Sequence, residues 1–433
     1  MRSLRYISVA VFSLVLIACG TETPVEFDDL LPGGGIKTGE VILEAPDFLE
    51  WDSVRTGFAF PQDVGYLVGA RDFDGGLNVN ILIKFNQVKE TLNYTDRDGE
   101  TRVDSLPELV AGNIALHLDT LRTLGDDEVE VAAYFVGEDW QIGSANWTHR
   151  VDTDTAKYEW AEPGGTRGAL IGTGTLTPGD TLLSISVSPE DLADLREYEV
   201  SDRGVLFEIL TSGSRVQITR AVLHYQTRPE FKPDTLHTDS ATMVSSLFLL
   251  ASSPEARDEI MVGGLPAWRS YMRFQDRLDT IQVPCPGSEG GCTLPLSEVE
   301  LNHASLELQP VQPQPGFAMV DTAHIETRIV LPLDLAPLPI ARAPLGRQLG
   351  GFGVAHPSYR GESLRPLKLT ITDLIDALTH QRPDGKDHPR TVALIANPEG
   401  ARIGVATYGG VDSGENAPQL RLIYSVLSED PDR

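Results

Sequence analysis

The residues that could do chemistry are scattered along this chain and match no catalytic motif. The 433 residues contain no H-E-x-x-H, no G-x-S-x-G and no Walker loop, and the nine histidines stand singly. Catalytic sites of these kinds need several reactive groups brought together. We therefore expect a protein without enzymatic activity. A hydrolase with an unrecognised carboxylate site is the alternative.

Two acidic turns contain the residue types that calcium prefers. One places Asp72 and Asp74 before two glycines, and the other places Asp96 and Asp98 beside Gly99. Calcium takes several hard oxygens from a tight loop, and D-x-D-G opens such loops. Neither turn has the full EF-hand series, and Asp-Gly is also typical of β-hairpin turns. We expect hairpin turns and no cofactor, with a structural calcium ion as the alternative.

Aromatic residues crowd into one short stretch of the first half. Exposed aromatic faces can stack on sugar rings while nearby polar groups hold the hydroxyls. A buried tryptophan is also common in the core of a β-sandwich. We expect a core role, with a ligand platform formed by Trp140, Trp147 and Trp160 as the alternative. The neighbouring aromatic residues are Tyr134, Phe135 and Tyr158.

Two of the three cysteines lie close together in sequence. Cys285 and Cys292 flank a run of Pro, Gly, Ser and Glu that can close into a loop. An even pair of this kind usually forms a disulfide in an oxidising compartment. A zinc site would need further ligands, and no histidine or third cysteine is near in sequence. We expect a disulfide between these two residues.

The third cysteine, Cys19, follows a segment typical of an export signal. Two arginines precede a short apolar run from Ile7 to Ala18, which is too short to span a membrane. Leu16-Ile17-Ala18-Cys19 resembles the lipobox of bacterial lipoproteins. The resemblance implies cleavage before Cys19 and attachment of acyl chains such as palmitate to it. Acyl chains provide a membrane anchor without a spanning helix.

The lipoprotein resemblance also implies where the protein resides. We expect 1–18 to be a signal peptide and 19–42 to be a flexible tether, since this stretch is polar and rich in proline and glycine. The mature protein would lie in the cell envelope, held by its lipid. Gly20, after the modified cysteine, favours the outer membrane, with the protein facing the periplasm or the cell surface.

The charge of the chain excludes partners that carry many phosphates. Acidic residues number 63 against 35 basic ones, which gives a formal net charge of −28. A phosphate backbone or an anionic lipid surface demands the opposite sign. We therefore expect no nucleic acid partner and a membrane contact made through the lipid anchor. The remaining partner classes are a polysaccharide and another envelope protein.

The body of the chain has the pattern of an all-β protein. Short runs of alternating apolar residues, such as 78–87, 128–136 and 181–188, are separated by Gly, Pro, Asn and Asp. Helical patterns are scarce. The two best lie at 189–198 and 371–381, and each is opened by an acidic or hydroxyl residue that suits an N-cap.

The strand and helix patterns occur twice in the same order. The segment 66–86 parallels 260–275, and 204–226 parallels 391–426, at an offset of roughly 180–200 residues. A copy of about 190 residues is the size of a sandwich of two antiparallel sheets. We expect two tandem antiparallel, jelly-roll-like β-sandwiches, at 43–230 and 244–428, joined by a linker at 231–243.

The repeated blocks resemble the DNRLRE-type β-sandwich modules of secreted bacterial proteins. The similar stretches are VGGLPAWRSYMRF at 262–274, LKLTITDLIDAL at 367–378, ENAPQLRLIYSV at 415–426 and DWQIGSANWTHR at 139–150. The resemblance implies a β-sandwich fold. Some relatives are carbohydrate-binding units for acidic polysaccharides such as alginate, a ligand that the net charge of −28 disfavours.

These observations predict a lipid-anchored, non-catalytic lipoprotein of the cell surface. It would serve binding, adhesion or envelope scaffolding, because the acyl chains hold it, the tether gives it reach, and the sandwiches present loops. A pair of polysaccharide-binding modules is the first alternative. The hydrolase with an unrecognised carboxylate site is the second.

Overall fold

The computed structural model describes residues 35–428 except for short gaps. These gaps lie at 60–64, 96–98, 106, 126, 231, 266, 276–277, 279, 286–287, 332–338, 360–363 and 380–387. The expected signal peptide at 1–18, Cys19, Asp96 and Asp98 therefore lie outside the described residues. None of the helices in the described part is both long enough and apolar enough to cross a bilayer.

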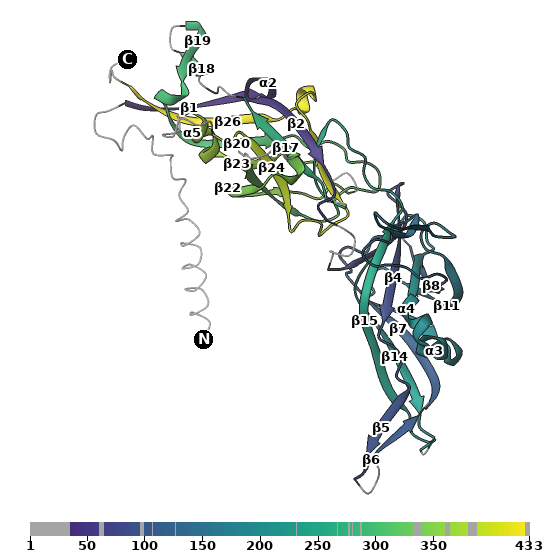
Figure 1. Cartoon of the computed structure of the whole chain (residues 1–433). Coiled ribbons are helices and arrows are strands. Elements are labelled where there is room, and N and C mark those ends of the chain that lie inside the picture. Colours follow the sequence, from purple (N-terminus) through teal and green to yellow (C-terminus); the bar gives the residue numbers. More distant parts are fainter. Residues whose placement is uncertain are drawn as a thin grey trace, which may run out of the picture.

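The all-β fold class is confirmed, because the chain forms antiparallel sheets with a few short helices. Figure 1 shows two bodies joined end to end. The first body contains β3 (Leu67–Phe73), β4 (Leu77–Phe85), β5 (Thr91–Thr95), β6 (Thr101–Ser105), β7 (Glu108–Leu118), β8 (Val129–Val136), β9 (His149–Asp152), β10 (Lys157–Glu159), β11 (Arg167–Leu176), β12 (Leu182–Val187), α3 (Pro189–Arg196), α4 (Tyr198–Arg203), β13 (Val205–Ile209), β14 (Ser214–Arg228) and β15 (His237–Leu250).

The second body combines the first described segment with the C-terminal half. Its elements are β1 (Gly35–Glu44), α2 (Ala45–Phe48), β2 (Leu49–Arg55), β16 (Glu259–Gly263), β17 (Arg269–Phe274), β18 (Thr280–Cys285), β19 (Ser288–Pro295), η3 (Leu296–Glu298), β20 (Glu300–Leu308), β21 (Ala323–Val330), η4 (Ile340–Arg342), β22 (Leu345–Ala355), β23 (Leu367–Thr370), α5 (Thr372–Thr379), β24 (Thr391–Asn397), β25 (Val405–Gly409), η6 (Gly414–Asn416) and β26 (Gln419–Ser428).

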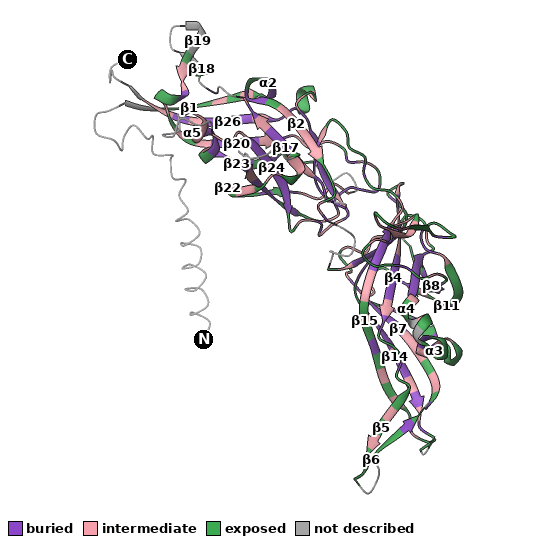
Figure 2. Cartoon of the chain, in the orientation of Figure 1, coloured by how far each residue is buried: buried purple, intermediate pink, exposed green. Residues whose placement is uncertain are grey.

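Both bodies bury the inward-facing residues of their strands between two sheet layers. In the first body the strands run in the order β11-β8-β13-β4-β15-β14-β7-β12, and the long strands β14 and β15 pass from one layer to the other. In the second body the layers are β2-β17-β24-β21-β22 and β1-β26-β20-β23. Figure 2 shows buried residues along the strands of both bodies, whereas the β5–β6 hairpin and α3 are mostly exposed or intermediate.

The two bodies have the same strand pairing when their elements are taken in chain order. The strand–helix pair β12–α3 corresponds to β23–α5, because β12 pairs with β7 as β23 pairs with β20. Strand β13 lies between β4 and β8, as β24 lies between β17 and β21. The hairpins β5–β6 and β18–β19 also correspond, and they lie at opposite ends of the molecule (Figure 1).

One strand segment in each body comes from the other copy. Strand β1 pairs with β26 along its whole length, and β2 pairs with β17. In the first body the same two places are filled by β15, whose first half pairs with β14 and whose second half pairs with β4. The segment that opens each copy in sequence therefore closes the other body in space.

This exchange corrects the expected domain boundaries. The tether at 19–42 is wrong from Gly35 onward, because this segment forms β1. The first sandwich does not begin at residue 43, because 43–55 belong to the second body. The linker at 231–243 is wrong from His237 onward, because β15 begins there and completes the first body. Alternation in sequence marks a strand but does not say which sheet receives it.

The N-terminal segment is held in the second body by apolar packing and by a close backbone approach. Ala45, Phe48 and Leu49 are almost fully buried, and the Phe48 and Phe274 ring centroids are 5.8 Å apart. Gly39 lies opposite Tyr424, and a Cβ at this glycine would overlap the tyrosine ring. A larger residue at position 39 would therefore displace the Tyr424 ring from this contact.

The two bodies meet in a continuous contact that combines apolar and charged groups. The core of the first body extends to Leu265, Phe317 and Ile403 of the second body. Phe73 stacks on Tyr359 with ring centroids 4.9 Å apart. These contacts extend the apolar packing of the first body across the junction.

A shared carboxylate adds a polar bridge to this contact. Asp321 of the second body accepts hydrogen bonds from Arg122 at 2.9 Å and from Arg402 at 3.0 Å. The Tyr66 hydroxyl donates to the carbonyl of Ala401, and burial raises the pKa of Tyr66 to about 12. This phenol therefore stays protonated, as its donor role requires, through the neutral range.

We expect Phe48→Ala to destabilise the second body rather than the first, by about 3–5 kcal/mol, because it leaves a cavity against Phe274. Hydrogen exchange should become faster in β17 and β26 and stay unchanged in β4 and β13. Ile42→Ala, at a side chain that is 51% exposed, is the control and should have little effect. Faster exchange confined to β4 and β13 would contradict the strand assignment.

Candidate functional site

The first acidic turn is a β-hairpin turn with a structural role. Asp72, near the end of β3, and Asp74, directly after it, have positive φ values of 45° and 52°. The Asp74 carboxylate accepts a hydrogen bond from the backbone N–H of Gly316 at 3.1 Å, which links the turn to the second body. No group of three His, Cys, Asp or Glu side chains suited to a metal ion occurs among the described residues.

The tryptophan stretch covers the outer face of one sheet of the first body. Trp140 and Trp160 are 7% and 5% exposed, and they pack on Leu82, Leu206 and other outward residues of this sheet, with Trp147 partly buried beside them. Rings in these positions have no free face for stacking against a sugar. The expected core role fits Trp140 and Trp160, whereas Trp147 is only partly buried.

The polar groups of this stretch are satisfied internally. The Trp140 indole N–H donates to the carbonyl of Arg203 at 2.7 Å, and the Trp160 N–H donates to the carbonyl of Asn146 at 2.8 Å. Next to them, the buried Glu208 accepts from Arg167 at 2.9 Å and from Asn80 at 3.2 Å. A buried carboxylate needs such partners, so the hydrogen bonds from Arg167 and Asn80 allow Glu208 to be buried in this packing.

The expected disulfide falls on the β18–β19 hairpin. Cys285 ends β18 and Cys292 lies in β19, and the register places them opposite Ser288 and Val283 respectively. The side chains of both cysteines lie outside the described part of the chain. The disulfide stays a prediction.

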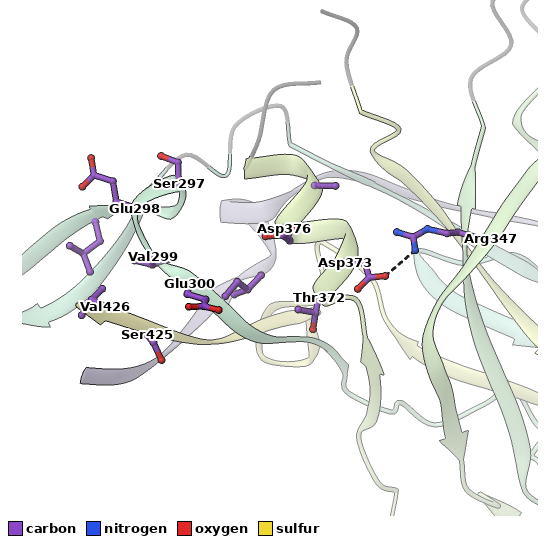
Figure 3. A pocket seen from close by; sticks show the side chains of 13 residues that line it. Ser297, Glu298, Val299, Glu300, Arg347, Thr372, Asp373, Asp376, Ser425 and Val426 are labelled. Carbon is purple, nitrogen blue, oxygen red and sulfur yellow. Dashed lines mark hydrogen bonds and ion pairs between the residues drawn. The ribbon is translucent and has the colours of Figure 1, made fainter. Parts of the chain in front are cut away.

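A groove of about 1170 Å³ lies at the far end of the second body. Three parts of the chain border the groove: η3 together with the start of β20, helix α5, and the end of β26 (Figure 3). Apolar residues of these elements and carboxylates both line it. The lining residues used below are Glu298, Glu300, Asp373, Asp376, Arg347 and Val426.

The groove has an excess of negative charge. Glu298, Glu300, Asp373 and Asp376 are all exposed acidic residues of its lining. The one basic lining residue, Arg347, donates to Asp373 at 3.0 Å (Figure 3). A field of this sign attracts a cationic group and repels an acidic polysaccharide.

Sequence reasoning missed this groove. Helix α5 is predicted correctly in outline, and its acidic residues could be read from the sequence. However, β26, η3 and α5 are distant in sequence, and their convergence depends on the pairing of β20 with β26 and on the packing of α5 beside β20. No local signal marks such a convergence.

Comparison with known proteins places the chain in no family. No family model matches it, and no curated protein matches it. Two solved structures are similar to it at 8% identity and a TM-score of 0.11. For the structure described as BspA_C_WT, the alignment covers 78% of this chain and 91% of that chain. For the Macrobrachium rosenbergii nodavirus structure, it covers 92% of each chain. At this TM-score, neither likeness identifies a fold or a function.

We expect Trp140→Ala to lower the stability of the first body by about 3–5 kcal/mol, because it removes a buried ring and leaves a cavity. Tyr158→Ala is the matched control from the same stretch, since its side chain is 53% exposed, and it should cost less than about 0.5 kcal/mol. Thermal unfolding followed by tryptophan fluorescence measures both. Equal losses for the two variants would contradict the core assignment.

Proposed function

We propose that this chain is a lipid-anchored, non-catalytic protein of the cell envelope that binds a partner in adhesion or scaffolding. The supporting observation is the position of the first described strand. Strand β1 begins at the end of the second body that is distant from the first body (Figure 1). The elements that form the acidic groove and the β18–β19 hairpin lie at the same end. An anchor at Cys19 would therefore hold this end near the membrane.

The arrangement suits presentation of the first body away from the membrane. From β1, the chain runs along the second body through α2 and β2 toward the first body, whose β5–β6 hairpin lies at the opposite end (Figure 1). The second body would thus act as a spacer. The groove, close to the anchor, would take a cationic segment of an envelope protein, because its charge favours that partner over an acidic polysaccharide.

The carboxylates of the groove give the hydrolase alternative little support. A glycosidase needs one carboxyl group that burial keeps protonated beside a second carboxylate. Glu298, Glu300, Asp373 and Asp376 are exposed, so none has the apolar surroundings that such an acid requires. Binding is the function that these side chains support best.

We expect Cys19→Ser to release the protein from the membrane fraction, since the variant cannot carry the thioether-linked lipid. Mass spectrometry of the mature N-terminus should find acylated Cys19 in the unaltered protein. Fractionation of the host envelope gives the second readout. An unmodified Cys19, or cleavage at another position, would contradict the proposed anchor.

We expect a double charge reversal, Glu298→Lys with Glu300→Lys, to weaken binding of a fluorescent oligolysine peptide about tenfold at low salt. Glu190→Lys with Asp194→Lys is the matched control, since it changes the net charge equally on α3, the counterpart of α5. An alginate oligosaccharide should bind neither form. Equal weakening by both double variants would show non-specific attraction and would refute the groove as the binding site.

A further inference from the structure

The tripeptide Asp-Thr-Leu occurs three times in the first body, in three different local structures. It follows β7 at 119–121, leads into β12 at 180–182 and precedes β15 at 234–236. A looser form, in which an aspartate is followed by serine or threonine and then by an aliphatic residue, occurs at 52–54, 104–106, 154–156, 239–241, 279–281 and 321–323. Since these local structures differ, the recurrence is not explained by one structural role.

The leucine of each Asp-Thr-Leu tripeptide is exposed. Leu121, Leu182 and Leu236 are 85%, 48% and 48% exposed, whereas most leucines of the chain belong to the core. A single exposed leucine needs no explanation. The same exposure at the same position of all three tripeptides indicates that packing does not determine the residue there.

The threonine hydroxyls of the three tripeptides are accessible to another protein. Thr120 and Thr181 are exposed and Thr235 is half-buried. Within the described part of the chain, these three hydroxyls make no hydrogen bond. By contrast, the hydroxyl of the nearby Thr177 donates to the Asp180 carboxylate at 2.7 Å. The three threonines therefore offer hydroxyls that the fold does not use.

A hollow of about 170 Å³ brings two of the tripeptides together, because Thr120 and Asp180 both line it. The backbone N–H of Leu118 donates to the carbonyl of Thr181 at 2.9 Å, which holds the two segments side by side. This volume is well below the about 300 Å³ at which ligand pockets begin. A single ring attached to Thr120 could occupy it, with oxygen atoms of Thr123 and Asp180 in the lining.

The surrounding charge distinguishes between the groups that a hydroxyl can receive. A phosphoryl group would add negative charge directly beside an aspartate in a chain whose formal net charge is −28, so like charges would repel. A neutral sugar adds no charge. The apolar face of a sugar ring can also lie against the exposed leucine and remove apolar surface from water.

We infer that Thr120, Thr181 and Thr235 are acceptors of O-linked sugars. The hydroxyl oxygen attacks the anomeric carbon of a glycosyl diphosphate, the bond from this carbon to the diphosphate oxygen breaks, and the diphosphate leaves with the electron pair. The hydroxyl proton passes to a base of the transferase, a separate enzyme that recognises the flanking aspartate and leucine. The inference rests on the envelope location in the proposed function and does not depend on the acidic groove.

The test is peptide mapping by mass spectrometry of the full-length protein, purified from the envelope of its host. Peptides that contain Thr120, Thr181 and Thr235 should carry a sugar, and fragmentation should locate it on these threonines. Thr235→Val should lose the sugar, and Thr235→Ser should keep it. Thr238 is the matched control, because it is exposed in the same segment but follows His237, and it should be unmodified.

A substitution of the neighbouring aspartate tests recognition by the transferase. We expect Asp234→Asn to lower the modified fraction at Thr235 about tenfold, which corresponds to the loss of one charge-assisted contact to the enzyme. Thr120 and Thr181 in the same molecule should keep their sugars. Unchanged modification at Thr235 would contradict the role of the tripeptide.

The same samples separate this inference from the proposed anchor. Unmodified threonines in a protein that carries acylated Cys19 would overturn the inference and leave the anchor intact. Unmodified threonines together with unmodified Cys19 would overturn both. A mass increase equal to a phosphoryl group, or equal modification of Thr238, would also overturn the inference.

Discussion

The pairing of β1 and β2 with the second body is the interaction on which the rest of the structure depends. Strand β1 forms the outer edge of one layer and β2 the edge of the other, and α2 between them buries Ala45 and Phe48. The free energy of this closure comes mainly from apolar burial, since the cross-strand hydrogen bonds replace bonds to water. One segment therefore completes both layers of the sandwich.

This closure also determines how the two bodies are connected. Because the first described segment belongs to the second body, the chain crosses from one body to the other twice, before β3 and after β15. Two covalent crossings and the bridge from Asp321 to Arg122 and Arg402 hold the junction together. In the proposed function, the position of the anchor and the spacer role of the second body both depend on the end at which β1 begins.

The sequence predicts the elements well and their assignment to bodies poorly. The alternation of apolar residues identifies strands such as β4, β8 and β12, and the capping box of Ser188 and Asp191 begins α3 where the pattern indicates. The repeated order of blocks corresponds to repeated pairing. The exchange of β1–β2 with β15 has no local signature, because an amphipathic strand fits either of two similar sheets.

The candidate site shows the same division between local and distant information. Burial of Trp140 and Trp160 follows from the size and apolar character of these side chains, which makes a core role the expected one. The groove forms where β26, η3 and α5 meet, and this meeting depends on sheet register far from each of them. Charge could be read from the sequence, whereas the surface that gathers it could not.

The most direct measurement is a distance in the intact chain by pulsed electron spin resonance. Labels at Thr38→Cys and Ser425→Cys should give strong dipolar coupling, because these residues are register partners in β1 and β26. In a second sample, the label at position 425 is replaced by one at Gln226→Cys. Gln226 lies in β14 of the first body, where its register partner is Thr238 of the closing strand β15. Weak coupling for 38 with 425, together with strong coupling for 38 with 226, would show that β1 closes the first body and would contradict the exchange.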